Sequence, residues 1–173
     1  MPLKLAEKQA IVAQVSTIAQ KAQSVLAAEY RGLTVTEMTE LRVVARKSGV
    51  HLQVVKNTLA RRAFENTAFV GLGEVLVGPI ILAFSPTEPS AAAKVFKTFT
   101  KTNPKLVVKY IAIGSQLLTA ADLDKVAALP TYQEAVSKLM AMLQAPISKL
   151  VRTLAEPQAK LVRTIAAIRD SKG

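Results

Sequence analysis

The stretch SKLVRTLAEPQAKLVRTIAAI, from Ser148 to Ile168, contains the pentapeptide KLVRT twice, with the second copy eleven residues after the first. A diverged unit begins eleven residues earlier, at Lys138. Eleven helical residues turn through about 1100°, which is only about 20° more than three full turns. Successive units of one helix would therefore present nearly the same face, about 16 Å apart along the axis. The spacing predicts a long C-terminal helix.

The apolar residues of these three units form one stripe along the predicted helix. Each unit supplies a leucine, then a methionine or valine, then a leucine or isoleucine, at positions i, i+1 and i+4: Leu139, Met140, Leu143, Leu150, Val151, Leu154, Leu161, Val162 and Ile165. Pro146 and Pro157 lie between the units, and a proline inside a helix removes a hydrogen bond and favours a kink. We expect a jointed helix that offers equivalent docking sites to copies of one partner.

Two other interpretations of the stripe remain open from the sequence. The helix could pack on its own domain, although three units would need a flat partner about 50 Å long. The chain could also be a basic amphipathic-helix protein that acts at membrane surfaces, although the apolar face lacks Trp and Phe. Arg152 and Arg163 are expected to flank the stripe, where they would favour the approach of an acidic partner.

The composition of the whole chain indicates a polyanionic partner. Among 173 residues, Lys and Arg number 23 against 12 Asp and Glu, which gives a net charge of +11 and is typical of nucleic-acid-binding proteins. The absence of cysteine excludes disulfides and thiolate metal sites and fits a reducing cytoplasm. The N-terminus lacks the apolar run of a signal peptide, and the run Val75–Phe84 is too short to span a bilayer. We expect a soluble protein.

Upstream of the tail, helical and strand patterns alternate along the chain. Strands are expected at Ser24–Tyr30, Val50–Lys56, Val75–Phe84 and Lys105–Ile113. Helices are expected at 5–22, from the capping box at Thr34–Glu37 to Gly49, from Asn57 or Thr58 through Phe64, from Pro89 and Ser90 to Asn103-Pro104, and at Thr119–Leu129. Capping boxes are expected at Thr34–Glu37 and Thr131–Glu134, and Asn57 or Thr58 is expected to cap a helix. These patterns predict an α/β domain over 1–130, with about four strands covered by helices in a plait-like two-layer arrangement, followed by the jointed helix over 131–173.

A basic cluster lies in the middle of the predicted domain. Six cationic residues fall between 41 and 64, where there is no Asp or Glu: Arg42, Arg46, Lys47, Lys56, Arg61 and Arg62. Arg61 and Arg62 are expected in the first turns of a helix, where cations oppose the helix dipole. A bound phosphate would resolve this conflict, so the cluster predicts a nucleic-acid site, with a solvated basic face as the alternative.

The sequence offers no pattern of catalytic residues. His51 is the single histidine, and Gly71 and Gly73 lack the third glycine of a dinucleotide-binding loop. No lysine-containing phosphate loop and no paired-carboxylate site is visible. We therefore expect no enzymatic activity, no metal site and no cofactor.

Five stretches occur in an order that is familiar from one protein family. They are YRGLTVTEMTELR (30–42), VVKNTLARRAF (54–64), VGPIILAFS (77–85), LPTYQEAVSKLM (129–140) and KLVRTIAAIRD (160–170). Together they make the chain resemble, essentially end to end, the bacterial large-subunit ribosomal protein ten family, whose members form the base of the ribosomal stalk.

The resemblance implies a set of partners. It implies an N-terminal domain that binds 23S ribosomal RNA at the GTPase-associated region, beside ribosomal protein eleven, and binding to the protein's own messenger RNA. It implies a mobile C-terminal helix that binds dimers of the acidic stalk protein seven/twelve, which recruit translational GTPases. The protein is then cytoplasmic, on the large ribosomal subunit. The RNA-binding residues that it implies are Lys56, Asn57, Thr58, Arg61, Arg62, Arg31, Arg46 and Lys47.

The tail departs from part of the family, because some members have a shorter tail with a single KLVRT-like unit next to a diverged one. This chain has one more eleven-residue unit, with Pro157 at its joint. We expect three stalk-protein dimers on each chain, or two if the first unit packs against the domain.

Overall fold

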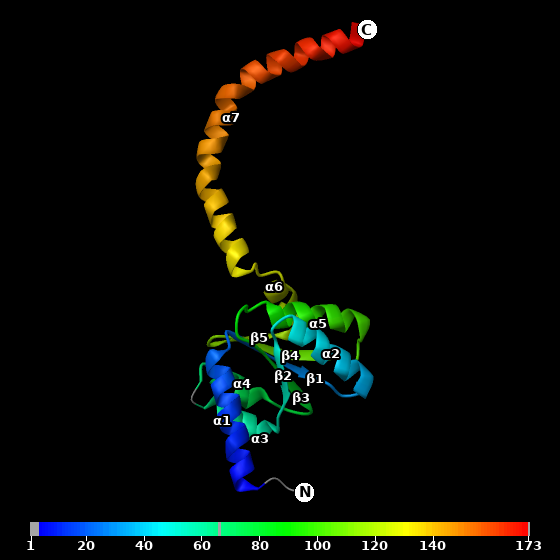
Figure 1. The fold of residues 1–173 in the computed structure, drawn as a ribbon, viewed down its shortest axis with the longest axis vertical. Helices are drawn as coiled ribbons and strands as arrows, with labels where there is room; N and C mark the ends of the chain where they lie inside the picture. Colours follow the sequence, from blue (N-terminus) through cyan, green and yellow to red (C-terminus); the bar gives the residue numbers. More distant parts are fainter. Residues whose placement is uncertain (1–3, 66, 173) are drawn as a thin grey trace. The chain divides into compact units, whose positions relative to one another are not determined.

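The structure is a computed structural model that describes residues 4–65 and 67–172 (Figure 1). The chain divides into two compact units, Met1–Leu129 and Pro130–Gly173. The first unit is built on one antiparallel sheet with the strand order β2-β3-β1-β4-β5. The strands are β1 (Ser24–Glu29), β2 (His51–Val54), β3 (Ile80–Ser85), β4 (Val107–Ile113) and β5 (Gln116–Thr119).

Helices cover both faces of this sheet (Figure 1). One face carries α2 (Val35–Lys47), α5 (Ala91–Thr102) and α6 (Leu123–Ala127), which follows the short 3-10 helix η1 (Ala120–Asp122). The other face carries α1 (Leu5–Lys21), α3 (Asn57–Phe64) and α4 (Val70–Val75). The α/β fold of a sheet covered by helices is confirmed, but it has three layers rather than the two that we expected.

The three layers follow from the alternation of side chains along the central strands. Successive residues of a strand point to opposite faces, so Leu26 and Ala28 join the core under α2 and α5, while Val25 and Ala27 join the core under α1 and α3. The register pairs β1 with β3 from Ser24 opposite Ser85 to Glu29 opposite Ile80. A sheet that is buried on both faces needs apolar side chains at nearly every position of its central strands.

The capping box predicted at the start of α2 is confirmed, and its hydrogen bonds join residues only three positions apart. At the start of α2, the backbone N–H of Thr34 donates to Glu37 Oε2 over 2.6 Å, and the N–H of Glu37 donates to Thr34 Oγ1 over 3.3 Å. The bond from the backbone of Thr34 is the main cause that lowers the pKa of Glu37. The chain leaves α2 at Gly49, whose φ of +68° is in the region that favours glycine.

Three parts of the N-terminal unit differ from the prediction. The strand expected over Val75–Phe84 begins only at Ile80, because Val70–Val75 forms α4. The short edge strand β5 was not predicted. Neither Asn57 nor Thr58 caps α3. Lys56 occupies the N-cap and makes no side-chain cap bond, because its ammonium group has no acceptor. The Asn57 amide donates to the Gly78 carbonyl over 3.0 Å.

The second unit is the helix α7 (Tyr132–Lys172), which has 41 residues. It begins with the predicted capping box, in which the Thr131 N–H donates to Glu134 Oε2 over 3.2 Å and the Glu134 N–H donates to Thr131 Oγ1 over 3.3 Å. The helix runs unbroken through Pro146 and Pro157 and is curved along its length (Figure 1). Among the residues that the structure describes, no helix has the length and apolar character that would let it cross a membrane.

Candidate nucleic-acid interface and docking helix

Strand β2 lies at one edge of the sheet, and two surface hollows lie along it. The first is lined by Arg42 and Arg46 of α2 and by residues 50–54. The second is lined by Tyr30, by residues 54–58 and by residues 78–80. The two hollows share Val54, so the fold brings the cations at the end of α2 into line with the start of α3. We call Arg42, Arg46, Lys56, Thr58 and Arg62 the basic edge.

Helix α3 sorts its polar residues into two rows. Leu59, Ala60, Ala63 and Phe64 are buried against the sheet. Asn57 and Arg61 are four residues apart, as are Thr58 and Arg62, and residues with this spacing lie one above the other on a helix. The row of Asn57 and Arg61 donates hydrogen bonds to residues that precede β3, although Arg61 is exposed to solvent, as Thr58 and Arg62 are.

Arg61 is held by the end of α4. Its Nε donates to the Gly73 carbonyl over 3.0 Å, and one Nη donates to the Leu76 carbonyl over 3.1 Å. The last carbonyls of a helix lack intrahelical partners, and a cationic side chain there is favourable. Because α3 has only eight residues, Arg61 and Arg62 lie in its last turn. The expected conflict with the dipole of α3 was therefore wrong.

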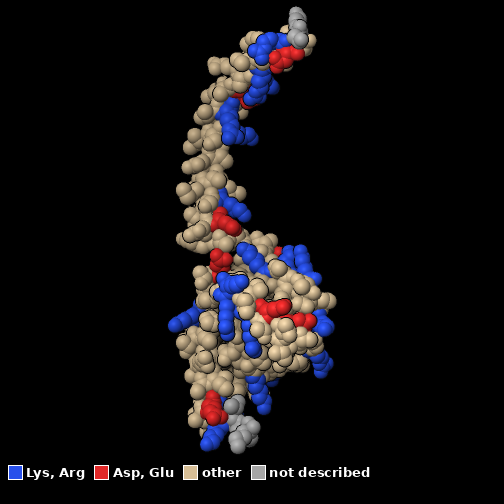
Figure 2. Space-filling model, turned by 45° about the vertical axis from the view of Figure 1, so that its right-hand side comes forward, with Lys and Arg blue, Asp and Glu red and all other residues tan. Residues whose placement is uncertain are grey.

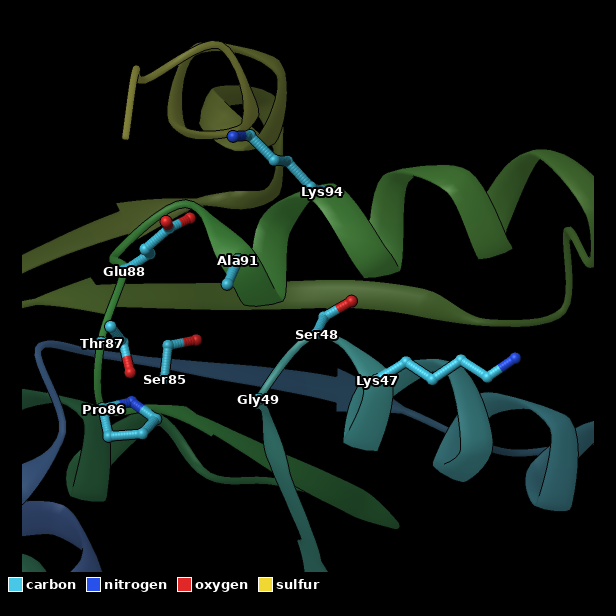
Figure 3. Close-up of a pocket in the computed structure, with 9 residues that line it drawn as sticks. All are labelled: Lys47, Ser48, Gly49, Ser85, Pro86, Thr87, Glu88, Ala91 and Lys94. Atoms are coloured by element: carbon cyan, nitrogen blue, oxygen red, sulfur yellow. The ribbon is translucent and has the colours of Figure 1, made fainter. Parts of the chain in front are cut away.

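Besides Asn57 and Arg61, two residues of the predicted RNA-binding set lie outside the basic edge. Lys47 lines a different hollow, between the end of α2 and the loop from Ser85 to Glu88, and its side chain points away from that loop (Figure 3). Arg31 lies near Glu29: the ion pair with Lys109, over 2.7 Å, is the main cause of the lowered pKa of Glu29, and the charge of Arg31 lowers it further. The field of Arg31 is thus partly cancelled by an acid.

Arg42 belongs to the predicted basic cluster but not to the RNA-binding set that the resemblance implies, and the structure supports its place in the candidate interface. Its spacing of four residues from Arg46 places both on one side of α2, and both line the hollow beside β2. That spacing is the signal in the sequence that could have added Arg42 to the RNA-binding set. Among the described residues, no group of His, Asp and Glu is arranged to hold a metal ion.

The predicted apolar stripe of α7 is exposed along the whole helix. The fractional exposure of its nine unit residues, from Leu139 to Ile165, runs from 56% for Met140 to 72% for Leu154. The two KLVRT units repeat in detail, because Thr153 Oγ1 donates to the Leu150 carbonyl over 2.7 Å and Thr164 Oγ1 donates to the Leu161 carbonyl over 2.8 Å. Such bonds back to the preceding turn are known to bend helices.

The cations of α7 do not flank the stripe as expected. Arg152 is two residues from both Leu150 and Leu154, which places it about 200° around the helix from each of them. Arg163 has the same relation to Leu161 and Ile165, and it pairs with Glu156 over 3.6 Å. In Figure 2 the blue side chains of α7 lie mostly along one side of the helix and uncharged residues along the other. An acidic partner on the stripe would therefore meet these cations only across the width of the helix.

Comparisons with known proteins place this chain in a family. Residues 3–101 match the family model described as ribosomal protein L10, and residues 129–156 match that of the ribosomal protein uL10 C-terminal region. The chain belongs to the ribosomal protein L10 family. The resemblance noted in the sequence is thus confirmed, and the chain is a structural protein of the large ribosomal subunit, in the cytoplasm, and not an enzyme.

Relatives in the ribosomal protein L10 family match over nearly the whole length. The large ribosomal subunit protein uL10 of Thioalkalivibrio sulfidiphilus is 56% identical over 172 residues, covering 99% of this chain and 98% of the relative. The proteins of the same name from Methylococcus capsulatus and Legionella pneumophila (strain Lens) are each 54% identical over 172 residues, covering 99% of this chain and 98% and 97% of the relatives. The C-terminal family model stops at residue 156, before Pro157, but these alignments continue, so the relatives share the length of the tail.

Proposed function

We propose that residues 1–130 bind 23S ribosomal RNA at its GTPase-associated region, beside ribosomal protein eleven, through the basic edge. The observation that carries this proposal is the row of cations along a free sheet edge, in a part of the chain that has no acid from 41 to 64. The basic residues are on the surface, where phosphates can reach them, and their charges add up over a stretch of backbone.

The salt dependence of RNA binding tests this interface. The double change Arg46→Gln and Lys56→Gln removes two phosphate contacts, so the slope of log K against log salt should fall by about 1.4–1.8 on a transcript of the GTPase-associated region. The matched control is Lys94→Gln with Lys101→Gln on α5, which removes the same charge elsewhere. If both double variants lower the slope equally, the protein binds RNA through its net charge alone and the assignment to β2 is wrong.

We propose that residues 131–173 form the docking segment for the acidic stalk protein seven/twelve. The observation that carries this proposal is the triplet of exposed apolar residues, repeated every eleven residues along α7. A groove on a partner dimer would bury one triplet, as in other helix-in-groove complexes. Pro146 and Pro157 remove one backbone hydrogen bond each between units, which lets each unit adjust to its own dimer.

One dimer on each unit gives three dimers per chain. The units at Leu150 and Leu161 are near copies, while the unit at Leu139 contains the more adaptable Met140 and Met142. Two dimers would bind if the first unit were occupied by other contacts. Repetition of the anchor set, rather than the length of the helix, is therefore what sets the stoichiometry.

Native mass spectrometry of the chain with its stalk protein counts the dimers directly. Leu161→Asp with Ile165→Asp should reduce three bound dimers to two, because it places charge in one anchor set only. Ala167→Asp, on the opposite side of the same turn, should leave three. Release of all dimers by the double change would contradict independent units. Sedimentation of the tail with anionic vesicles in place of the stalk protein would favour the membrane-surface interpretation.

A further inference from the structure

The two polar rows of α3 have different hydrogen-bond partners, although both belong to the predicted RNA-binding set. Asn57 Nδ2 donates to the Gly78 carbonyl, and the guanidinium of Arg61 donates to the carbonyls of Gly73 and Leu76. The three acceptors lie at Gly73, in the last turn of α4, and at Leu76 and Gly78, in the link from α4 to β3, so all of them fall within the segment 73–78. The row of Asn57 and Arg61 is thus already used to hold another part of the protein.

We propose that Asn57 and Arg61 are positioning residues that fix the segment 73–78, and that the RNA backbone contacts the other row, Thr58 and Arg62, together with Lys56, Arg42 and Arg46. The inference rests on the proposed RNA-binding function and divides the residues of that site. It assigns different roles to the adjacent arginines of one sequence motif, which sequence reasoning treated as equivalent.

The surroundings of the two arginines support the division. Arg61 lines a hollow with Glu65, Val70 and Gly73, so an acid lies beside it and lowers its attraction for a phosphate. Gly73 lies against Arg61, because a Cβ there would be in ordinary van der Waals contact with Cα of Arg61, at 3.6 Å. Both arginines are exposed, but Arg62 follows Thr58 by one helical turn on the side away from these contacts.

The contacts of Asn57 and Arg61, the positioning row, also explain how Thr58 and Arg62, the binding row, are oriented. The segment 73–78 leads into β3, and β3 pairs with β2 from His51 opposite Phe84 to Val54 opposite Ile81. Bonds from α3 to that segment therefore fix the helix against the strand next to β2. With α3 fixed, the backbone of one RNA strand can run from the hollow of Arg42 and Arg46, past Lys56, to Arg62.

Single substitutions of the two arginines in the full chain give a matched test. Arg62→Gln should lower the salt slope for the 23S transcript by about 0.7–0.9, so that on going from 50 to 200 mM salt the variant loses about threefold less affinity than the wild type, with an unchanged melting temperature. Arg61→Gln should leave the slope unchanged. It should lower the melting temperature by a few degrees and speed amide exchange in residues 73–78, since two carbonyl acceptors lose their donor.

Lysine substitutions separate charge from geometry. Arg62→Lys should keep both the salt slope and the melting temperature, because the ammonium of lysine can neutralise a phosphate as the guanidinium does. Arg61→Lys should keep the slope but lose protection of residues 73–78, because one ammonium cannot reproduce the forked contacts to two carbonyls. Thr58→Ala and Asn57→Ala form a second matched pair, of which only Asn57→Ala should speed exchange in that segment.

The outcomes decide each half of the inference separately. If Arg61→Gln lowers the slope as much as Arg62→Gln and leaves amide exchange unchanged, Arg61 is a phosphate ligand and the division is overturned. If the wild-type chain does not bind the transcript, the proposed function and the binding row both fail. The exchange measurements on the free protein would still decide whether Asn57 and Arg61 are positioning residues.

Discussion

Helices α5 and α7 are both amphipathic, but only α5 buries its apolar side. Phe96 of α5 is fully buried against the sheet, whereas Leu154 of α7 is 72% exposed. The globular unit buries an apolar core on each face of its sheet and exposes its cations, while α7 exposes both apolar residues and cations, on opposite sides. Apolar residues of the first unit therefore stabilise the fold, and those of the second are available for a partner.

A pair of leucine-to-alanine changes should show the largest difference between the two units. Leu41→Ala in α2 removes a fully buried side chain and should cost about 2–5 kcal/mol in the free energy of unfolding. Leu154→Ala should change that free energy by less than about 0.5 kcal/mol, because its side chain is already solvated. Chemical denaturation followed by circular dichroism measures both.

The same two variants should reverse their order in a binding assay. Leu154→Ala should weaken the middle stalk-protein site, while Leu41→Ala should leave all sites intact at temperatures where the chain stays folded. A loss of several kcal/mol of stability in Leu154→Ala would mean that α7 contributes to the folded core.

Local signals explain how much of the fold could be predicted. The capping boxes at Thr34 and Thr131 close within four residues, and the alternation of helices and strands needs no distant contact. Helix α4 was missed because Val70–Val75 contains two glycines and is held by Arg61, which comes from another helix. Strand β5 was missed because it has four residues and an exposed Leu117, so the pattern of a buried strand is absent.

The candidate site shows the same limit. The sequence predicted the basic cluster, because the absence of acids from 41 to 64 is visible in one dimension. It could not divide Arg61 from Arg62, because the acceptors of Arg61 lie 12 and 15 residues further along the chain. It also misplaced Arg152 and Arg163 beside the stripe, although helical spacing alone puts them on the other side.

The cations of α7 should have a smaller effect, on the rate at which the helix associates with its partner. Arg152→Gln with Arg163→Gln should slow association with the acidic stalk protein by a few-fold at low salt and leave dissociation nearly unchanged. The helix is about 10 Å wide, which is about one Debye length at 0.1 M salt, so these charges attract a partner without touching it. Stopped-flow or surface-binding kinetics separates the two rates, with Lys94→Gln and Lys101→Gln as the control for net charge. A large rise in the dissociation rate would show direct ion pairs.

The smallest expected effect concerns how the stability of the globular unit changes as the pH falls. Lys97 Nζ on α5 pairs with Asp124 Oδ1 on α6 over 2.8 Å, and this bond is the main cause that lowers the pKa of Asp124. A carboxyl whose pKa is lowered by folding stabilises the fold above its unfolded pKa of about 3.9, and this contribution is lost as pH falls through the folded value.

Asp124→Asn should therefore be slightly less stable than the wild type at pH 7, and the difference should shrink as the pH falls below about 4. The difference should also shrink in high salt, because both side chains are partly exposed and their attraction is screened. Asp170→Asn removes an acid that pairs with Arg169 in α7, and it should leave the unfolding of the globular unit unchanged at every pH. Thermal unfolding at pH 7 and pH 3 measures these differences. A difference between Asp124→Asn and the wild type that persists at pH 3 would show that the side chain acts through packing rather than through its charge.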